Sequence, residues 1–163
     1  MRYSKRLFFV CLLMGSIFLL SCGKSAFFEE NQHIVSDTWK QGDTLYYKVQ
    51  VADTIHFFDF YLNVRNSTEY RYRNLYLFIN TRFPGGGIAR DTVECILASA
   101  DGKWHGKGMG KIKDSRILFK KAVRFPHAGT YLIGIEQAMR EEQLAGIREI
   151  GRASCRERVY LAV

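Results

Sequence analysis

The chain has 163 residues and a formal net charge of +8, but this charge is unevenly distributed. Three basic residues near the N-terminus and a net +2 in residues 152–163 account for five of the eight charges, so residues 22–150, with 18 basic and 15 acidic side chains, carry only +3. This balance excludes the strongly basic face that a nucleic-acid-binding domain needs. The roughly 130 residues between these ends suffice for one domain with one core.

The N-terminal segment has the parts of an export signal. Arg2, Lys5 and Arg6 precede an apolar run over residues 7–20 that is too short to span a bilayer as a helix. The run ends in Leu-Leu-Ser-Cys, which is similar to the bacterial lipobox. In that motif the cysteine becomes the mature N-terminus and carries acyl chains such as palmitate, each buried methylene contributing about 0.8 kcal/mol. We therefore predict a signal peptide over residues 1–21 and a lipid anchor on Cys22; an ordinary secretory signal is the alternative.

Residues 22–42 show little periodicity and are predicted to form a tether between the acylated cysteine and the domain. The alternative is that Phe27 and Phe28 dock on the domain as a first edge strand. Gly23 follows the cysteine, and the absence of Asp at this position favours an outer-membrane location facing the periplasm.

Residues 43–150 are predicted to form the folded domain. Apolar and polar residues alternate over residues 58–65, 75–79 and 131–135, which indicates half-buried strands. Further strands are predicted over residues 45–51, 92–97 and 117–125, with turn-forming residues at 66–68, 84–87, 101–102 and 126–129. This spacing predicts an all-β fold, a single antiparallel β-sandwich of about seven or eight strands with a jelly-roll or immunoglobulin-like topology.

The C-terminal part departs from the alternation. Over residues 137–147 the apolar residues do not recur with period two, so a short helix is predicted, with a long corner as the alternative. Residues 147–150 are predicted to open a last strand. From Ile150 to Val159 the sequence matches a frame translation of a common sequencing adapter. We therefore predict that residues 151–163 are an adapter artefact that cuts the strand short; a genuine basic tail is the alternative.

Residue types suited to catalysis are sparse. With Cys22 acylated and Cys155 foreign, Cys95 is the thiol left in the domain, where we expect a buried, small apolar side chain and no disulfide. The histidines lie without metal-ligand spacing, at His33, His56, His105 and His127. We expect no metal, no cofactor and no enzymatic activity.

Residues 102–111, Gly-Lys-Trp-His-Gly-Lys-Gly-Met-Gly-Lys, are the most unusual internal stretch. Their glycine spacing fits neither a phosphate-binding loop nor a dinucleotide fingerprint. The simplest interpretation is a flexible hairpin with Trp104 packed as a lid. The sharper hypothesis is a partner-binding loop formed by Lys103, Trp104, His105 and Lys107, because a tryptophan beside lysine is an amphipathic anchor of the kind found at interfaces.

Tyrosines are frequent in the predicted strands, at Tyr46, Tyr47, Tyr61, Tyr70, Tyr72 and Tyr76. Arranged as a row on one outer face, such rings could stack on sugars, so a carbohydrate-binding envelope lipoprotein is the alternative function. The simpler interpretation is that these tyrosines occupy half-exposed positions because tyrosine favours strands.

The lipobox and five internal segments together form a pattern typical of a known protein family. The segments lie over residues 58–65, 72–78, 102–108, 129–131 and 135–140. Together they resemble the GldH family of gliding-motility lipoproteins, from Met1 to Ile150. The resemblance implies a non-enzymatic accessory lipoprotein of the envelope machinery that links gliding to type IX secretion. It also implies two partners, the membrane through Cys22 and other gliding or secretion envelope proteins, and it carries over no catalytic residues.

Overall fold

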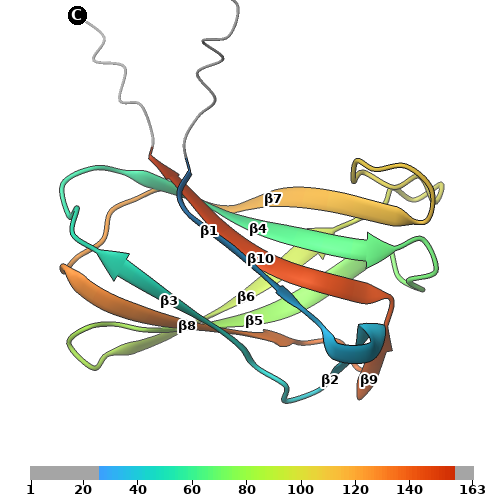
Figure 1. Ribbon diagram of the computed structural model, residues 1–163, viewed down its shortest axis with the longest axis horizontal. Helices are drawn as coiled ribbons and strands as arrows, with labels where there is room; N and C mark the ends of the chain where they lie inside the picture. Colours follow the sequence, from blue (N-terminus) through green and yellow to red (C-terminus); the bar gives the residue numbers. More distant parts are fainter. Residues whose placement is uncertain (1–25, 157–163) are drawn as a thin grey trace, which may run out of the picture.

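The computed structural model describes residues 26–156, which form ten strands and one short 3-10 helix (Figure 1). The strands are β1 (Ala26–His33), β2 (Thr38–Lys40), β3 (Leu45–Val51), β4 (Phe58–Ser67), β5 (Asn74–Arg82), β6 (Ile88–Ile96), β7 (Ile112–Val123), β8 (Gly129–Gln137), β9 (Gln143–Ala145) and β10 (Ile147–Arg156), and the helix is η1 (Val35–Asp37). The structure confirms the prediction of an all-β fold.

The strands form two four-stranded sheets and one small two-stranded sheet. One sheet has the order β1-β10-β4-β7 and the other the order β3-β8-β5-β6, while β2 pairs with β9. Every pair is antiparallel, as predicted. Among the described strands, β5 and β6 are the consecutive pair that shares one sheet, so elsewhere the chain passes from one sheet to another.

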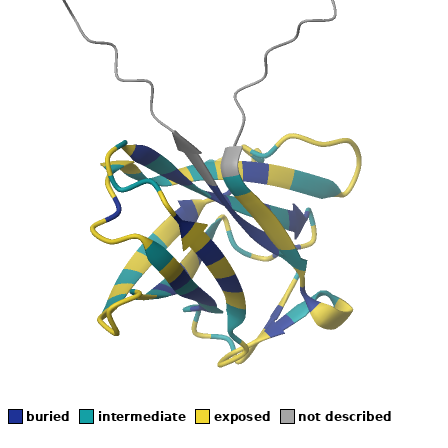
Figure 2. Ribbon diagram, turned by 60° about the vertical axis from the view of Figure 1, so that its left-hand side comes forward, coloured by how far each residue is buried: buried dark blue, intermediate teal, exposed yellow. Residues whose placement is uncertain are grey.

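The two four-stranded sheets share one hydrophobic core, and buried and exposed residues alternate along their strands (Figure 2). On β4 the side chains of Phe58, Phe60 and Leu62 are buried, as the alternation predicted. Phe125 joins the two sheets, because its ring centroid lies 5.4 Å from that of Phe60 and 5.0 Å from that of Tyr131 on β8. Burying each such side chain contributes about 1.5–3 kcal/mol.

The β1-β10-β4-β7 sheet gives the domain two ends. At the first, Ala26 pairs with Cys155, which pairs with Asp59 near the start of β4. At the second, Ser67 at the end of β4 pairs with Ile112 at the start of β7. We call these the anchor-side end and the distal end; a strand the length of β4 separates them by about 30 Å.

The prediction of a tether is wrong for residues 26–42. β1 pairs with β10 along its whole length, and β2 follows it. Trp39 on β2 is 1% exposed, and its Nε1 donates a hydrogen bond of 2.8 Å to the Asp43 carbonyl. Residues 26–42 are therefore part of the folded domain, as the alternative of a first edge strand predicted. Backbone pairing with β10 explains why this strand forms without apolar alternation.

The short helix predicted within residues 137–147 is also wrong, and the alternative of a long corner is confirmed. Gln137 organises this corner, because its Oε1 accepts a bond from the Met139 amide at 2.9 Å and its Nε2 donates to the Glu141 carbonyl at 2.7 Å. Leu144 on β9 is then buried against the core. Gly146 closes the corner with φ of +91°, where an added Cβ would lie 2.9 Å from the Tyr70 Cα.

The last strand does not end at Ile150. β10 continues to Arg156 and pairs with β1 on one side and β4 on the other. Backbone ladders of this kind need no particular side chain, which is why the sequence pattern did not reveal the extension. The interpretation of residues 151–163 as adapter-derived concerns their origin and stays a prediction.

Candidate functional site

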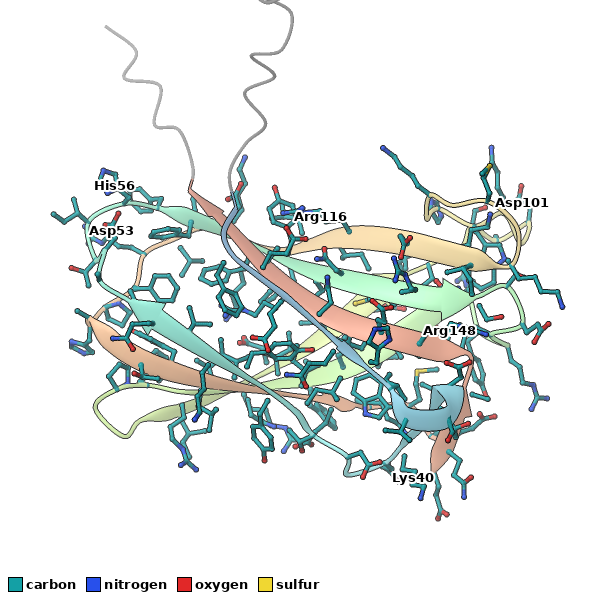
Figure 3. All side chains as sticks on the ribbon, viewed as in Figure 1. Lys40, Asp53, His56, Asp101, Arg116 and Arg148 are labelled. Carbon is teal, nitrogen blue, oxygen red and sulfur yellow. The ribbon has the colours of Figure 1, made fainter. Side chains whose placement is uncertain are left out.

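The predicted partner-binding loop lies between β6 and β7 and projects from the distal end of the domain, as the position of Asp101 in Figure 3 shows. We call residues 97–111 the distal loop. A tight turn shapes its first half, where the Ser99 amide donates to the Lys103 carbonyl at 2.9 Å and the His105 amide donates to the Leu97 carbonyl at 2.9 Å. The loop is therefore a hairpin, as the simpler interpretation predicted, but one that backbone hydrogen bonds hold in place and not a flexible one.

The four predicted loop residues lie together, but they face different surroundings. Trp104 is half-buried and packs against the hydrophobic core, opposite Ala98 in a backbone bridge. Lys103, His105 and Lys107 are exposed. Trp104 thus holds the hairpin on the domain, while its neighbours expose two cationic side chains and an imidazole to solvent.

The second half of the loop is fixed by close backbone contacts. Lys107 and Asp114 exchange two backbone hydrogen bonds of 2.8 and 2.7 Å. Gly108 has φ of +137°, and an added Cβ would lie 2.5 Å from the Ile112 carbonyl oxygen, so glycine is required there. Met109 follows at the tip and is 97% exposed. Sequence reasoning missed Met109, although its position between two glycines was a signal of exposure.

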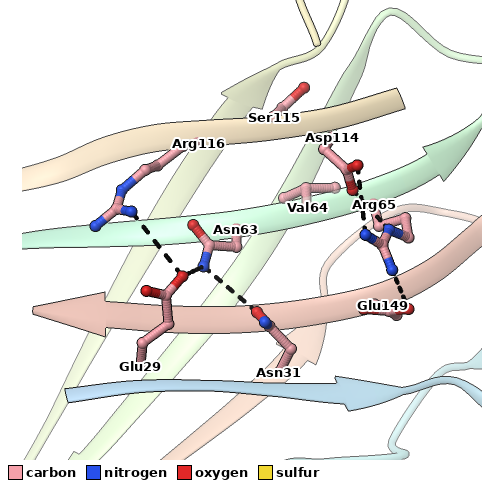
Figure 4. Close-up of a pocket in the computed structure, with 9 residues that line it drawn as sticks. All are labelled: Glu29, Asn31, Asn63, Val64, Arg65, Asp114, Ser115, Arg116 and Glu149. Atoms are coloured by element: carbon pink, nitrogen blue, oxygen red, sulfur yellow. Dashed lines mark hydrogen bonds and ion pairs between the residues drawn. The ribbon is translucent and has the colours of Figure 1, made fainter. Parts of the chain in front are cut away.

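A polar groove crosses the outer face of the β1-β10-β4-β7 sheet (Figure 4). Arg65 on β4 bridges two carboxylates, with its Nε 2.6 Å from Asp114 and its Nη1 2.6 Å from Glu149. These hydrogen bonds, first to Asp114 and then to Glu149, raise the pKa of the guanidinium. Asn63 donates to Glu29 at 3.0 Å. The groove was not predicted, and its charged groups bind one another.

The six tyrosines do not form one row. Tyr47 and Tyr70 are buried, and their hydroxyls donate to the carbonyls of Ile150 at 2.7 Å and Asn74 at 2.9 Å. Tyr46 and Tyr76 are exposed on the β3-β8-β5-β6 sheet, whereas Tyr61 lies on the other sheet beneath the Arg116 guanidinium, 4.6 Å from its ring centroid. The hydroxyl of Tyr72 donates to Glu141 at 2.5 Å. The structure therefore does not arrange the six tyrosines as one row for stacking on sugars.

The histidines lie apart in the fold. His33 is 3.2 Å from Glu149 on the outer sheet face, His56 is 2.7 Å from Asp53 in the β3–β4 loop, and His105 lies in the distal loop. Within residues 26–156 no group of three or more His, Cys, Asp or Glu side chains is placed to hold a metal ion. Cys95 is buried as predicted, and burial raises the pKa of its thiol to about 12.

Arg152 is the buried cation of the interior. It lies on the core side of β10, opposite Leu62, and is 3% exposed. Its guanidinium carbon lies 4.8 Å from the Phe60 ring centroid, and Nε and Nη1 have no hydrogen-bond partner among the described residues. Desolvation lowers the pKa of Arg152 to about 10.

The signal segment and Cys22 lie outside the described residues, so the predicted lipidation site has no structural description. In the part of the chain from residue 26 to 156, no helix has the length and apolar character needed to cross a membrane. Three residues, 23–25, separate Cys22 from the start of β1.

Comparison with known proteins identifies relatives of the whole domain. A family model described as GldH lipoprotein matches residues 26–153. The gliding motility lipoprotein GldH homolog of Christiangramia forsetii is 32% identical over 152 residues, covering 88% of this chain and 93% of that protein. The gliding motility lipoprotein GldH of Flavobacterium johnsoniae is 32% identical over 147 residues, covering 86% and 91%.

Among solved structures, a chain from the structure of the infectious bursal disease virus Gx strain aligns with 83% of this chain and 34% of its own length. Its TM-score is 0.27 and its sequence identity is 10%, which is too little similarity to carry an argument.

Proposed function

The chain belongs to the GldH lipoprotein family, and from this premise we propose that it is a lipid-anchored accessory protein of the gliding-motility machinery. The observation that carries the proposal is the family match over residues 26–153, joined to two relatives that are named gliding motility lipoproteins. The lipobox supplies the anchor, with a diacylglycerol on Cys22.

The finer parts of the proposal follow from the sequence resemblance. The protein supports type IX secretion together with gliding, it does no chemistry of its own, and it sits on the outer membrane facing the periplasm. The Gly23 that follows Cys22 supports this location.

The distal loop is the proposed contact with an envelope protein of this machinery. It lies at the distal end of the β1-β10-β4-β7 sheet, whereas the start of β1, which follows the anchor, lies at the other end, so the loop faces away from the membrane that holds Cys22. Lys103, His105 and Lys107 are exposed there, while the hairpin backbone and Trp104 hold them in place. A preorganised loop costs less ordering entropy on binding than a flexible one. An acidic partner surface fits its two lysines.

The eight long strands support a jelly-roll β-sandwich as the scaffold. The sheet orders β1-β10-β4-β7 and β3-β8-β5-β6 bring early and late strands together in each sheet. This arrangement is the one that two interleaved Greek keys generate. The carbohydrate-binding alternative has less support, because Tyr47 and Tyr70 are buried and Tyr61 lies on the other sheet, so the six tyrosines do not form one row.

Two experiments test the proposal. Metabolic labelling with a palmitate analogue should mark the wild-type protein and not the Cys22→Ala variant. Equal labelling of both proteins would contradict a lipid anchor on Cys22. Affinity capture of the acylated protein from membranes, followed by mass spectrometry, should recover gliding or secretion envelope proteins. A Lys103→Ala, Lys107→Ala double variant should lose them. The matched control removes two exposed lysines elsewhere, Lys40→Ala with Lys48→Ala, and should retain them.

A further inference from the structure

The β3–β4 loop, residues 52–57, lies at the anchor-side end and exposes two large apolar side chains. Ile55 is 74% exposed and Phe57 is 38% exposed. The loop leads directly into β4, and His56 marks its place beside the start of that strand in Figure 3. Single exposed apolar side chains are common on protein surfaces, so the surroundings of Ile55 and Phe57 decide whether these two side chains have a function.

The strand register brings this loop close to the anchor. Ala26 is two strands away from Asp59, through Cys155, which corresponds to about 10 Å. Cys22 is four residues before Ala26, and four residues reach at most about 14 Å. An acyl group on Cys22 therefore keeps the anchor-side end of the domain near the lipid headgroups, and the β3–β4 loop lies at that end.

The loop is held in one conformation. The Asp53 Oδ1 accepts hydrogen bonds from the amides of Ile55 and His56, each 3.0 Å long, and its Oδ2 lies 2.7 Å from His56 Nδ1. This turn projects Ile55 outward without the ordering cost of a flexible segment.

The cations beside the loop suit a lipid–water boundary. The Arg124 guanidinium lies 5.8 Å from the Phe57 ring centroid, and both Arg124 and Lys121 are exposed. Long basic side chains can lay their methylenes along an apolar surface while their charges stay in water or meet phosphates. Asp53 and Asp59 nearby are engaged with backbone amides and offset these charges, so apolar insertion is the main attraction.

We propose that the β3–β4 loop inserts Ile55 and Phe57 into the interface of the membrane that carries the Cys22 anchor, and so fixes the orientation of the domain on that membrane. This inference rests on the proposed lipid anchor. Apolar side chains of this kind enter the boundary between headgroups and acyl chains. The acyl chains supply the affinity for the membrane. The β3–β4 loop fixes the orientation of the domain, and therefore the direction in which the distal loop points.

The test uses the acylated full chain reconstituted in vesicles of phosphatidylethanolamine and phosphatidylglycerol. In a Cys155→Ser background, Ile55→Cys carries an environment-sensitive dye, while buried Cys95 is protected from labelling. Met109→Cys is the matched control, because Met109 is 97% exposed at the distal end. We expect the dye at position 55 to shift to the blue and to be quenched by lipid-borne nitroxide, and the dye at position 109 to do neither.

Vesicle flotation separates the two proposals. Chains that float while the dye at position 55 reports water would overturn the loop inference and leave the anchor intact. Chains that do not float would overturn the anchor and the inference together. As a further check, Phe57→Asp should keep flotation and lower the quenching at position 55 at least twofold; unchanged quenching would count against insertion.

Discussion

Trp104 packs a half-buried indole against the core, so its truncation removes apolar contacts. We expect Trp104→Ala to lower the free energy of unfolding by about 2 kcal/mol, less than the roughly 3–5 kcal/mol of a fully buried aromatic residue. Urea denaturation measures the change. Lys103→Ala in the same loop removes an exposed side chain and should leave the midpoint unchanged. A Trp104→Ala protein as stable as wild type would show that the indole does not secure the hairpin.

Arg152 places a guanidinium in the core whose Nε and Nη1 have no hydrogen-bond partner among the described residues, and a buried charge with unmade hydrogen bonds destabilises a fold. We expect Arg152→Leu to raise the free energy of unfolding by about 1–3 kcal/mol. The control Arg65→Leu breaks two ion pairs and should destabilise. Loss of stability in Arg152→Leu would indicate that the arginine belongs there.

Asp53 makes the order of the β3–β4 loop depend on pH. Hydrogen bonds from backbone amides lower the pKa of Asp53 from 3.8 to about 2, and the His56 amide makes the largest contribution. A lowered carboxyl pKa means that the stabilisation is complete above pH 4 and is lost as the pH falls towards 2. We expect amide exchange at Ile55, corrected for the intrinsic rate, to accelerate over this interval while the buried Leu77 amide stays protected. Asp53→Asn keeps an acceptor without a charge, and its exchange should not respond in this way.

At the scale of elements, the corner after β8 depends on one buried amide. Gln137 is 2% exposed and supplies hydrogen bonds to Met139 and Glu141 that a helix would have supplied from its backbone. Gln137→Ala leaves the Met139 amide and the Glu141 carbonyl without these partners. We expect the free energy of unfolding, measured by thermal or urea denaturation, to fall by about 1–3 kcal/mol. Gln143→Ala, at an exposed position of β9, is the control and should unfold like wild type.

Alternation predicted the strands that have one buried and one half-exposed face. β3 was predicted with its observed bounds, and the buried positions of β4, such as Leu62 and Val64, were predicted individually. β1, β2 and β9 were not predictable in this way, because backbone pairing and a few buried residues such as Trp39 define them.

The residues of the candidate site were likewise predicted only in part. The composition of the distal loop drew attention to Lys103 and Lys107, and the structure leaves both exposed. The inward packing of Trp104 and the polar groove around Arg65 depend on contacts between distant strands, which no local pattern records.

At the scale of the whole molecule, we expect membrane anchoring and folding to be separable. The buried cluster of the described core is made of residues between Ile34 and Ile150, and we expect it to form without the acyl group on Cys22. We expect Cys22→Ala, produced without its signal segment, to melt at the wild-type temperature in differential scanning fluorimetry while failing to float with vesicles. A large fall in melting temperature would mean that the lipid contributes to the fold.

β1 has a mechanical consequence. It is the first strand after the anchor and an edge strand, and it runs antiparallel to β10 through a continuous set of paired residues from Phe28 to His33. A pull between Cys22 and a partner held at the distal loop acts along the strands, while the ladder hydrogen bonds lie across them. The bonds then bear the force together, in shear, and cannot open one after another as in a peeled hairpin. The pairing of β1 with β10 thus gives the domain a geometry that resists a force applied through its lipid anchor.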